Sequence, residues 1–139
     1  MPPENNRPPS FLKNYDNLTQ VLADKQLASL GDAYINFVYS IALSRKKGRP
    51  CGTKVKGTTL AEALRKAGLR QLLPSRIDKH IISDAAEALI VYAWLHNLLT
   101  IEDSVATLKE NGNTENGLTQ LLLQAKEKIR LSELFPVPC

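Results

Sequence analysis

Cysteine is scarce in this 139-residue chain, and the features that would place it in several common classes of protein are missing. The two cysteines, Cys51 and Cys139, form neither a CxxC motif nor a Cys/His cluster, which excludes a zinc site of that type and a disulfide framework. No apolar run approaches the roughly 20 residues that a membrane-spanning helix needs. The amino terminus has neither a signal-peptide nor a transit-peptide pattern. We therefore expect a protein of the reducing cytoplasm, without a membrane partner.

Alternation of apolar and polar residues with a period of two is not sustained anywhere in the sequence. Apolar residues recur instead at intervals of three and four, which is the pattern of amphipathic helices, so the predicted fold class is all-α. The length suits one domain, which we expect to span residues 11–139. Residues 1–10 contain four of the eight prolines and no apolar periodicity, and they are predicted to form a flexible tail.

Positive charge is concentrated in the middle of the chain. The net charge is +4, but residues 45–79 contain 11 Lys and Arg against Glu62 and Asp78. A basic segment of this kind is typical of a nucleic-acid-binding surface, although a merely solvated basic face is the alternative. The candidate RNA-binding residues are Arg45, Lys46, Lys47, Arg49, Lys54, Lys56, Arg65, Lys66, Arg70, Arg76 and Lys79.

Helix-start and helix-end signals divide the chain into a series of predicted helices. The strongest covers residues 26–45 and is closed by Gly48 in a left-handed conformation. The others are a short helix capped by Asp16 or Asn17, a helix with a Thr59–Glu62 capping box ending at Gly68, a long helix over 76–97, a helix capped by Thr100 and ending near Asn111, and a last helix over 118–131. Between the first long helix and the Thr59 helix, residues 49–57 form a basic loop interrupted by glycines, the best candidate for backbone contacts to phosphate.

Two helices carry carboxylates that an ordinary core helix would not have. Asp32 lies off the apolar stripe of its helix, and Gly31 beside it costs about 1 kcal/mol of helix propensity relative to alanine, which indicates that something approaches the backbone there. Asp84 and Glu87 share one face of a helix that is apolar on nearly every side. Burying two unpaired carboxylates is costly, so they must be solvated in a cleft, paired with basic residues or bound to a cation.

Together the sequences LGDA at residues 30–33 and DAAEALI at residues 84–90 resemble the catalytic domain of the ribonuclease III family. The resemblance is to the short archaeal and Mini-III-like members, which lack a double-stranded-RNA-binding domain. It implies a ribonuclease III-like helical bundle and a metal-dependent endoribonuclease that hydrolyses phosphodiester bonds of double-stranded or structured RNA. The implied metal is Mg²⁺, with Mn²⁺ as an alternative, and hard cations of this kind take carboxylate oxygens as ligands.

The resemblance also implies roles for particular residues. Asp32, Asp84 and Glu87 would be the metal ligands, and Asp32 and Glu87 the catalytic pair. The helix that contains Asp32 would pack against its counterpart in a homodimer. Small residues on that helix would permit the close approach: Ala28, Ser29, Ala33 and Ser40.

One position departs from the pattern of the longer family members, which have a glutamate one helical turn before the signature aspartate. This chain has Ala28 at that position. The Mini-III-like pattern also lacks an acidic residue there. Glu62 is a possible additional carboxylate, although the capping box offers it a structural role, and Asn36 could orient a carboxylate or hold a water. His80 and His96 are interpreted as structural or surface residues.

Two other functions remain open from the sequence. The first is a catalytically impaired RNA-binding or ribosome-associated protein on the same fold, which the basic segment and Ala28 favour. The second is an all-α dimeric interaction module whose carboxylates pair with Arg or Lys instead of a metal. Ion pairs at Asp32 and Glu87, with no shared cleft, would favour this module.

Overall fold

The computed structural model describes residues 7–137, and within them it contains six α-helices, one short 3-10 helix and no β-strand. The helices are α1 (Leu18–Leu22), α2 (Lys25–Lys47), α3 (Gly57–Lys66), η2 (Arg70–Leu72), α4 (Lys79–Leu95), α5 (Ile101–Glu110) and α6 (Thr114–Ser132). The predicted all-α class is confirmed. Most of the predicted flexible tail, residues 1–6, lies outside the described part. No helix in the described range has the length and apolar character to cross a membrane.

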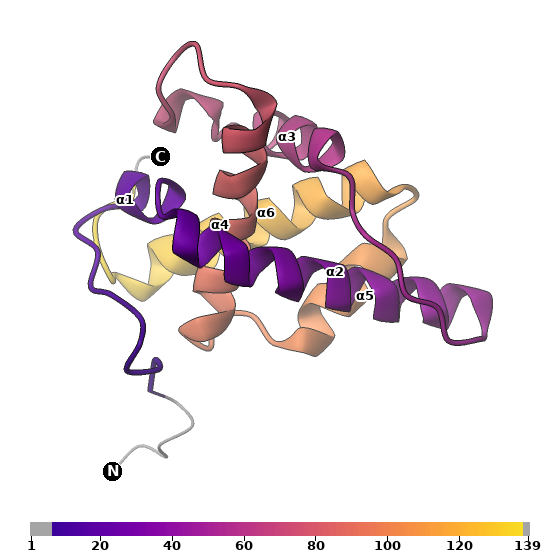
Figure 1. Cartoon of the computed structure of the whole chain (residues 1–139). Helices are drawn as coiled ribbons and strands as arrows, with labels where there is room; N and C mark the ends of the chain where they lie inside the picture. Colours follow the sequence, from indigo (N-terminus) through magenta and orange to yellow (C-terminus); the bar gives the residue numbers. More distant parts are fainter. Residues whose placement is uncertain (1–6, 138–139) are drawn as a thin grey trace.

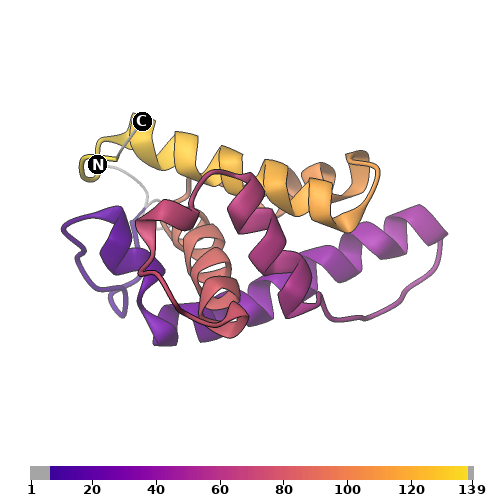
Figure 2. The same cartoon turned by 90° about the horizontal axis from the view of Figure 1, so that it is seen from above.

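Helix α4 lies at the centre of the bundle. Figure 1 shows α2 running across it, and Figure 2 shows α4 almost end-on between α2 on one side and α6 on the other. Helices α1 and α3 also pack on α4, while α5 packs against α2 and α6. The central helix therefore meets neighbours on most of its circumference, as its apolar sequence predicts.

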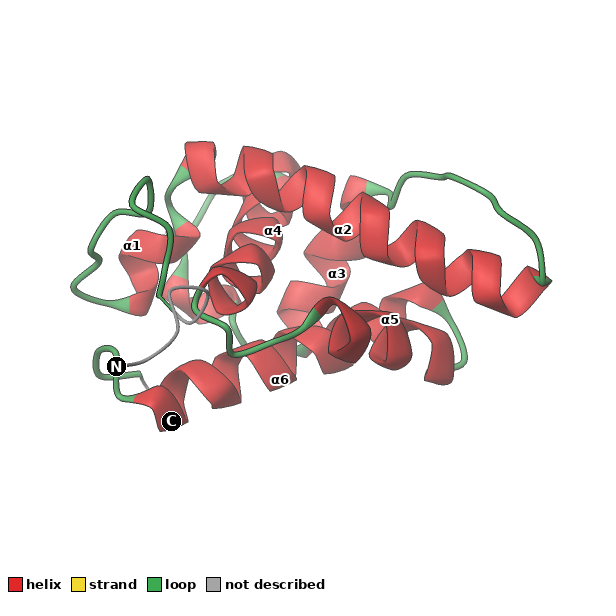
Figure 3. Cartoon of the chain, turned by 90° about the horizontal axis from the view of Figure 1, so that it is seen from below, coloured by secondary structure: helices red, strands yellow, loops and turns green. Residues whose placement is uncertain are grey.

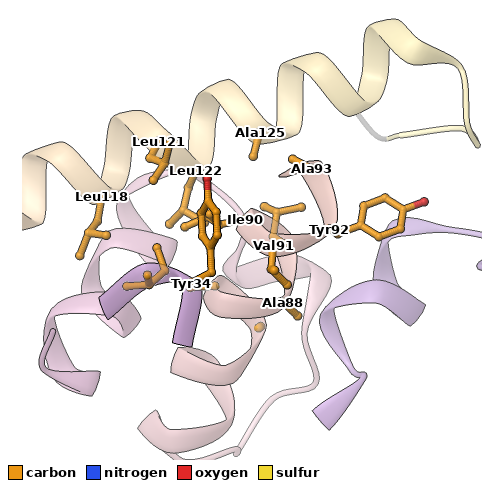
Figure 4. Packing of buried hydrophobic residues seen from close by; sticks show 14 of the residues in the cluster. Tyr34, Ala88, Ile90, Val91, Tyr92, Ala93, Leu118, Leu121, Leu122 and Ala125 are labelled. Atoms are coloured by element: carbon orange, nitrogen blue, oxygen red, sulfur yellow. The ribbon is translucent and has the colours of Figure 1, made fainter. Parts of the chain in front are cut away.

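The core forms where α4 faces α6. Every residue from 85 to 93 is buried, including Glu87. Figure 4 shows residues of α4 such as Ile90 and Val91 beneath the apolar face of α6 formed by Leu118, Leu121 and Leu122. Burial on this scale is the main source of the bundle's stability and makes α4 a rigid support for the side chains near its amino-terminal half.

Several predicted helix ends are confirmed. The side chain of Asn17 caps α1 by accepting from the amide of Gln20. Gly48 closes α2 with φ of 71°, and Thr100 and Asp103 form a reciprocal capping box at the start of α5.

Other predicted boundaries were wrong. The Thr59–Glu62 capping box does not exist, because α3 begins two residues earlier at Gly57 and its N-cap, Lys56, makes no side-chain cap. The second long helix is shorter than residues 76–97, since Arg76 and Asn97 have φ of 58° and 60°, which end a helix. The last helix begins at Thr114, before its apolar stripe starts at Leu118.

Candidate active site

Gly31 is the point at which α2 crosses α4. A Cβ atom on Gly31 would lie 2.1 Å from the carbonyl oxygen of Glu87, so no side chain fits between the two backbones. This confirms the close approach that the glycine predicts. Because Asp32 directly follows Gly31 in α2, the crossing brings its side chain next to that of Glu87 in α4.

The three predicted carboxylates line one pocket. Asp32 from α2 and Asp84 and Glu87 from α4 border a cavity of about 520 Å³. Ala28, Lys54 and His80 are also in its wall. The pocket therefore combines three carboxylates with a lysine and an imidazole in its wall.

Glu87 is the most deeply placed of the three acids. The residue is only 5% exposed, and its Oε2 atom is buried without a hydrogen-bond partner in the described part of the chain. Burial raises the pKa of Glu87 from 4.5 to about 8, helped by a hydrogen bond with Asp32 and by the negative charges of Asp32 and Asp84. The positive charge of Lys54 acts in the opposite direction. In the absence of a cation, the pocket thus favours a protonated Glu87 at neutral pH.

The two aspartates are held differently. Asp32 is exposed, and its Oδ1 atom accepts a 3.0 Å hydrogen bond from the Nδ2 of Asn36, one turn later in α2. Asp84 is about one-fifth exposed, and its Oδ2 lies 3.7 Å from the Nε2 of His80, one turn earlier in α4. Asn36 thus orients a carboxylate, as its spacing suggested, and His80 lies at the rim of the pocket.

The donor set of the pocket suits a hard divalent cation. Buried polar atoms in folded proteins nearly always have a partner, so the orphaned Oε2 of Glu87 calls for a proton or a cation. Carboxylate oxygens are the ligands that Mg²⁺ and Mn²⁺ prefer. As they stand, however, no three His, Cys, Asp or Glu side chains within residues 7–137 are grouped closely enough to hold an ion. A shared ion would have to draw the three carboxylates together.

Comparison with known protein families shows which family the chain belongs to. A sequence model of the family described as ribonuclease III matches residues 25–132, which is most of the chain. The chain belongs to the ribonuclease III family. Comparison with curated proteins gives no significant match. Membership supports an endoribonuclease in general, because the family acts on double-stranded RNA and generally uses divalent metal ions.

Ala28 is the predicted departure from the pattern of longer ribonuclease III proteins. It lines the carboxylate pocket and is 3% exposed. The departure therefore lies inside the pocket itself. The pocket has three acidic side chains where a fuller set would have four.

Glu62 is not brought into the pocket. Its carboxylate pairs with Arg65, one turn later in α3, which holds the pKa of Glu62 below its usual range. It caps no helix either, because the predicted capping box is absent. The fourth acid of the ribonuclease III pattern is thus not replaced by this residue in the structure.

The eleven candidate RNA-binding residues fall into two groups. Arg45 forms a two-pronged pair with Glu102, Lys66 pairs with Glu115, and Arg65 pairs with Glu62. Arg70 donates to the backbone carbonyls of Leu73 and Pro74. The others are exposed and have no ion pair with any described residue: Lys46, Lys47, Arg49, Lys54, Lys56, Arg76 and Lys79. These seven are the cations that remain available to a polyanion.

The loop between α2 and α3 is only partly free for the predicted backbone contacts to phosphate. Alternate amides, those of Cys51, Thr53 and Val55, donate to side-chain oxygens of α2 over 2.8–3.0 Å. They are therefore not available for backbone contacts to phosphate. The acceptors are Ser44, Ser40 and Asn36, which follow one another at four-residue intervals.

This role of Ser40 and Ser44 was missed from the sequence. The only signal is the spacing N-x3-S-x3-S along one side of α2, which can equally be a solvated face. Ser40 was expected to permit close helix approach in a dimer, yet it bonds the loop within the same chain. Ala28 also faces inward, so of the four small residues only Ser29 and Ala33 are exposed.

The pocket does not match the expectation for an interaction module. That interpretation predicted ion pairs at Asp32 and Glu87 and no shared cleft. In the described range neither residue forms an ion pair, and both line the same cavity.

Proposed function

We propose that this chain is a metal-dependent endoribonuclease that hydrolyses phosphodiester bonds of double-stranded or structured RNA. The observation that carries the proposal is the meeting of Asp32, Asp84 and Glu87 in one pocket, at a helix crossing that only glycine permits. Asp32 and Glu87 are the proposed catalytic pair, and all three acids are the proposed metal ligands.

Mg²⁺ is the proposed metal, and Mn²⁺ would serve as a substitute. When bound, such an ion supplies a water of lowered pKa and neutralises charge on the reacting phosphate. The chain's own contribution is to fix the acids before substrate arrives. Asn36 holds the Oδ1 of Asp32, and α4, buried along most of its length, holds Glu87. Burial favours the protonated form of Glu87, and a divalent cation held by its carboxylate would favour the ionised form instead.

RNA would lie across the unpaired cations described above. They belong to the end of α2, the following loop, the segment before α4 and the first residue of α4, Lys79. Their charges suit the phosphate backbone of a duplex, which proteins recognise largely by shape and phosphate position. Binding should therefore weaken steeply as salt concentration rises.

A homodimer is the proposed assembly, formed through the outward face of α2. Leu30 and Phe37 on that face are 38% and 53% exposed, and Ala33 lies between them. Exposed apolar side chains at intervals of three and four residues, as at 30, 33 and 37, are typical of a helix that packs on a partner. We further propose a cytoplasmic location and a single domain over residues 11–139.

The decisive experiment is cleavage of a defined RNA duplex by purified protein in Mg²⁺ or Mn²⁺. We expect wild type to cut, and Asp32→Asn and Glu87→Gln to lose on the order of a thousandfold in rate or more while still binding duplex. Asp103→Asn is a matched control, because Asp103 belongs to the α5 capping box away from the pocket. An inert wild type that binds duplex would contradict the proposal.

A second function is favoured by Ala28 together with the basic segment at residues 45–79. If the missing fourth acid abolishes chemistry, the protein is a catalytically impaired RNA-binding or ribosome-associated member of the family. In that case salt-sensitive RNA binding persists and is unaffected by EDTA, and neither metal yields cleavage. Ala28→Glu would then be expected to introduce metal-dependent cleavage, which would identify the lost residue.

A further inference from the structure

The loop between α2 and α3 is bound to α2 along its length. Figure 3 shows it in green, leaving the far end of α2 and turning back toward α3. Ser44 bonds Cys51, Ser40 bonds Thr53 and Asn36 bonds Val55, so the loop runs antiparallel to the helix. Four helical residues rise about 6.0 Å and two extended residues about 6.6 Å, which is why every second loop amide meets every fourth helix residue.

The last of these bonds joins the loop to the carboxylate cluster. Asn36 accepts from the amide of Val55 through its Oδ1 and donates to Asp32 through its Nδ2, over 2.8 Å and 3.0 Å. One amide side chain thus fixes the loop and an active-site acid relative to each other. The residue between the two attached amides of Thr53 and Val55 is Lys54.

Lys54 lines the same pocket as the three acids. Its ammonium group has no ion pair within 4 Å among the described residues, although its charge is felt at Glu87. Lys25 and His80 also line the pocket, but they belong to α2 and α4 and not to the attached loop. Lys54 therefore shares the pocket with the acids without pairing with them, and the bonds of its neighbours Thr53 and Val55 hold its backbone in place.

A cation in this position fits one kind of ligand group. The acids would hold metal on one side of the pocket, and an anionic oxygen of the substrate must enter beside them. An ammonium without a partner at that entrance suits a non-bridging phosphate oxygen, as a charge-assisted donor. We propose that Lys54 contacts the reacting phosphodiester, or the phosphate next to it, and is a substrate-binding residue of the active site and not only one of the surface cations.

This inference rests on the proposed function and is tested by variants of the same loop. Lys54→Met removes the charge in the pocket, Lys54→Arg keeps it, and Lys56→Met removes an exposed charge outside the pocket on the same segment. The rate of cleavage is measured under single-turnover conditions with saturating duplex. We expect Lys54→Met to lose about 10- to 100-fold, Lys54→Arg to recover most of that loss, and Lys56→Met to change by less than about threefold.

The affinity for duplex RNA, measured in EDTA, tests the role of Lys54 without requiring RNA cleavage. We expect affinity to fall about tenfold for Lys54→Met and about threefold for Lys56→Met, because removal of Lys54 leaves the acids of the pocket without a counter-charge facing the RNA. Melting temperatures of the two variants should match. If both variants lose the same rate at saturation and the same affinity, Lys54 is an ordinary surface cation and the inference is overturned.

The loop attachment has its own test. Ser40→Ala removes both bonds to Thr53 and no charge, so we expect the saturated rate to fall about threefold to tenfold with little change in affinity. An unchanged rate would overturn the role of the loop in positioning Lys54. If wild type itself does not cleave, the proposed function fails. The affinities in EDTA then still show whether Lys54 contributes more to RNA binding than Lys56 does.

Discussion

Gly31 shows most directly how one residue sets the geometry of the pocket. Any side chain there would collide with the backbone of Glu87, which belongs to a buried helix and cannot retreat. Glycine lowers the stability of the helix, but at this position it allows the close crossing that places the neighbouring Asp32 beside Glu87.

Replacement of Gly31 by alanine should therefore force α2 away from α4. We expect the free energy of unfolding to fall by at least about 2–3 kcal/mol, because overpacking at a backbone contact cannot be relieved by a side-chain rotation. Chemical denaturation measures this loss. Gly52→Ala is the control, since its Cβ would meet nothing within 4 Å. Equal stability of the two variants would contradict the close crossing.

Glu87 provides a second test at the scale of one residue. Its pKa is about 8 in the folded protein and near 4.5 when unfolded, so the unfolded chain loses this proton first as pH rises. The wild-type protein, free of metal, should therefore lose stability between about pH 4.5 and pH 8. Glu87→Gln avoids this loss, and we expect it to be more stable than wild type by about 1–3 kcal/mol at pH 8.

The measurement is urea unfolding in EDTA at pH 5 and pH 8. The advantage of Glu87→Gln should be small at pH 5 and grow toward pH 8, whereas Glu110→Gln, at an exposed position of α5, should show no such trend. A constant difference at both pH values would refute the electrostatic account. Added Mg²⁺ should stabilise wild type more than the variant.

At the scale of helices, the two threonines predicted to start capping boxes behave differently. Thr100 accepts from the amide of Asp103 and caps α5, whereas Thr59 lies within the first turn of α3 and caps nothing. We expect Thr100→Ala to lower the free energy of unfolding by about 1 kcal/mol and Thr59→Ala to have almost no effect. Thermal unfolding distinguishes them, and a larger loss for Thr59→Ala would mean that α3 begins later than observed.

The same two helices show which boundaries a sequence can predict. Thr100 and Asp103 carry their signal locally, and so do Asn17 and Gly48. The start of α3 has no such local signal, because its N-cap, Lys56, makes no side-chain cap, and its first residue, Gly57, lies beside Ser83 of the distant α4. The first turn of α6 is polar, so the apolar stripe that begins at Leu118 does not predict that the helix starts at Thr114.

For the whole molecule, the proposed dimer is tested through the exposed face of α2. Phe37→Glu places a charge in that face, and we expect it to convert a dimer to a monomer because a buried unpaired carboxylate in the interface is costly. Leu131→Glu, on α6 and 64% exposed in wild type, is the control. Sedimentation or light scattering gives the mass. A monomeric wild type at micromolar concentration would contradict the dimer.

The candidate site was predictable from the sequence to the extent that its residues sit in continuous motifs. Gly31 and Asp32 are adjacent, and Asp84 and Glu87 share one turn, so local spacing and a family resemblance predicted their roles. The position of Lys54 was not predictable. It depends on the attachment of the extended loop to α2, in which every second loop amide meets every fourth helix residue. Glu62 was ambiguous for a different reason, since a capping box with Thr59 and an ion pair with Arg65, one turn later, are both local patterns.

The attachment of the loop to α2 has a consequence for amide hydrogen exchange. The N–H groups of Cys51, Thr53 and Val55 bond to side chains, whereas those of Gly52 and Lys54 have no such bond. Protection from deuterium uptake should therefore alternate along this segment, as it does along an edge strand of a sheet. This loop has no regular secondary structure, yet its amides would exchange in the alternating pattern of an edge strand, because they bond to the side chains of a helix.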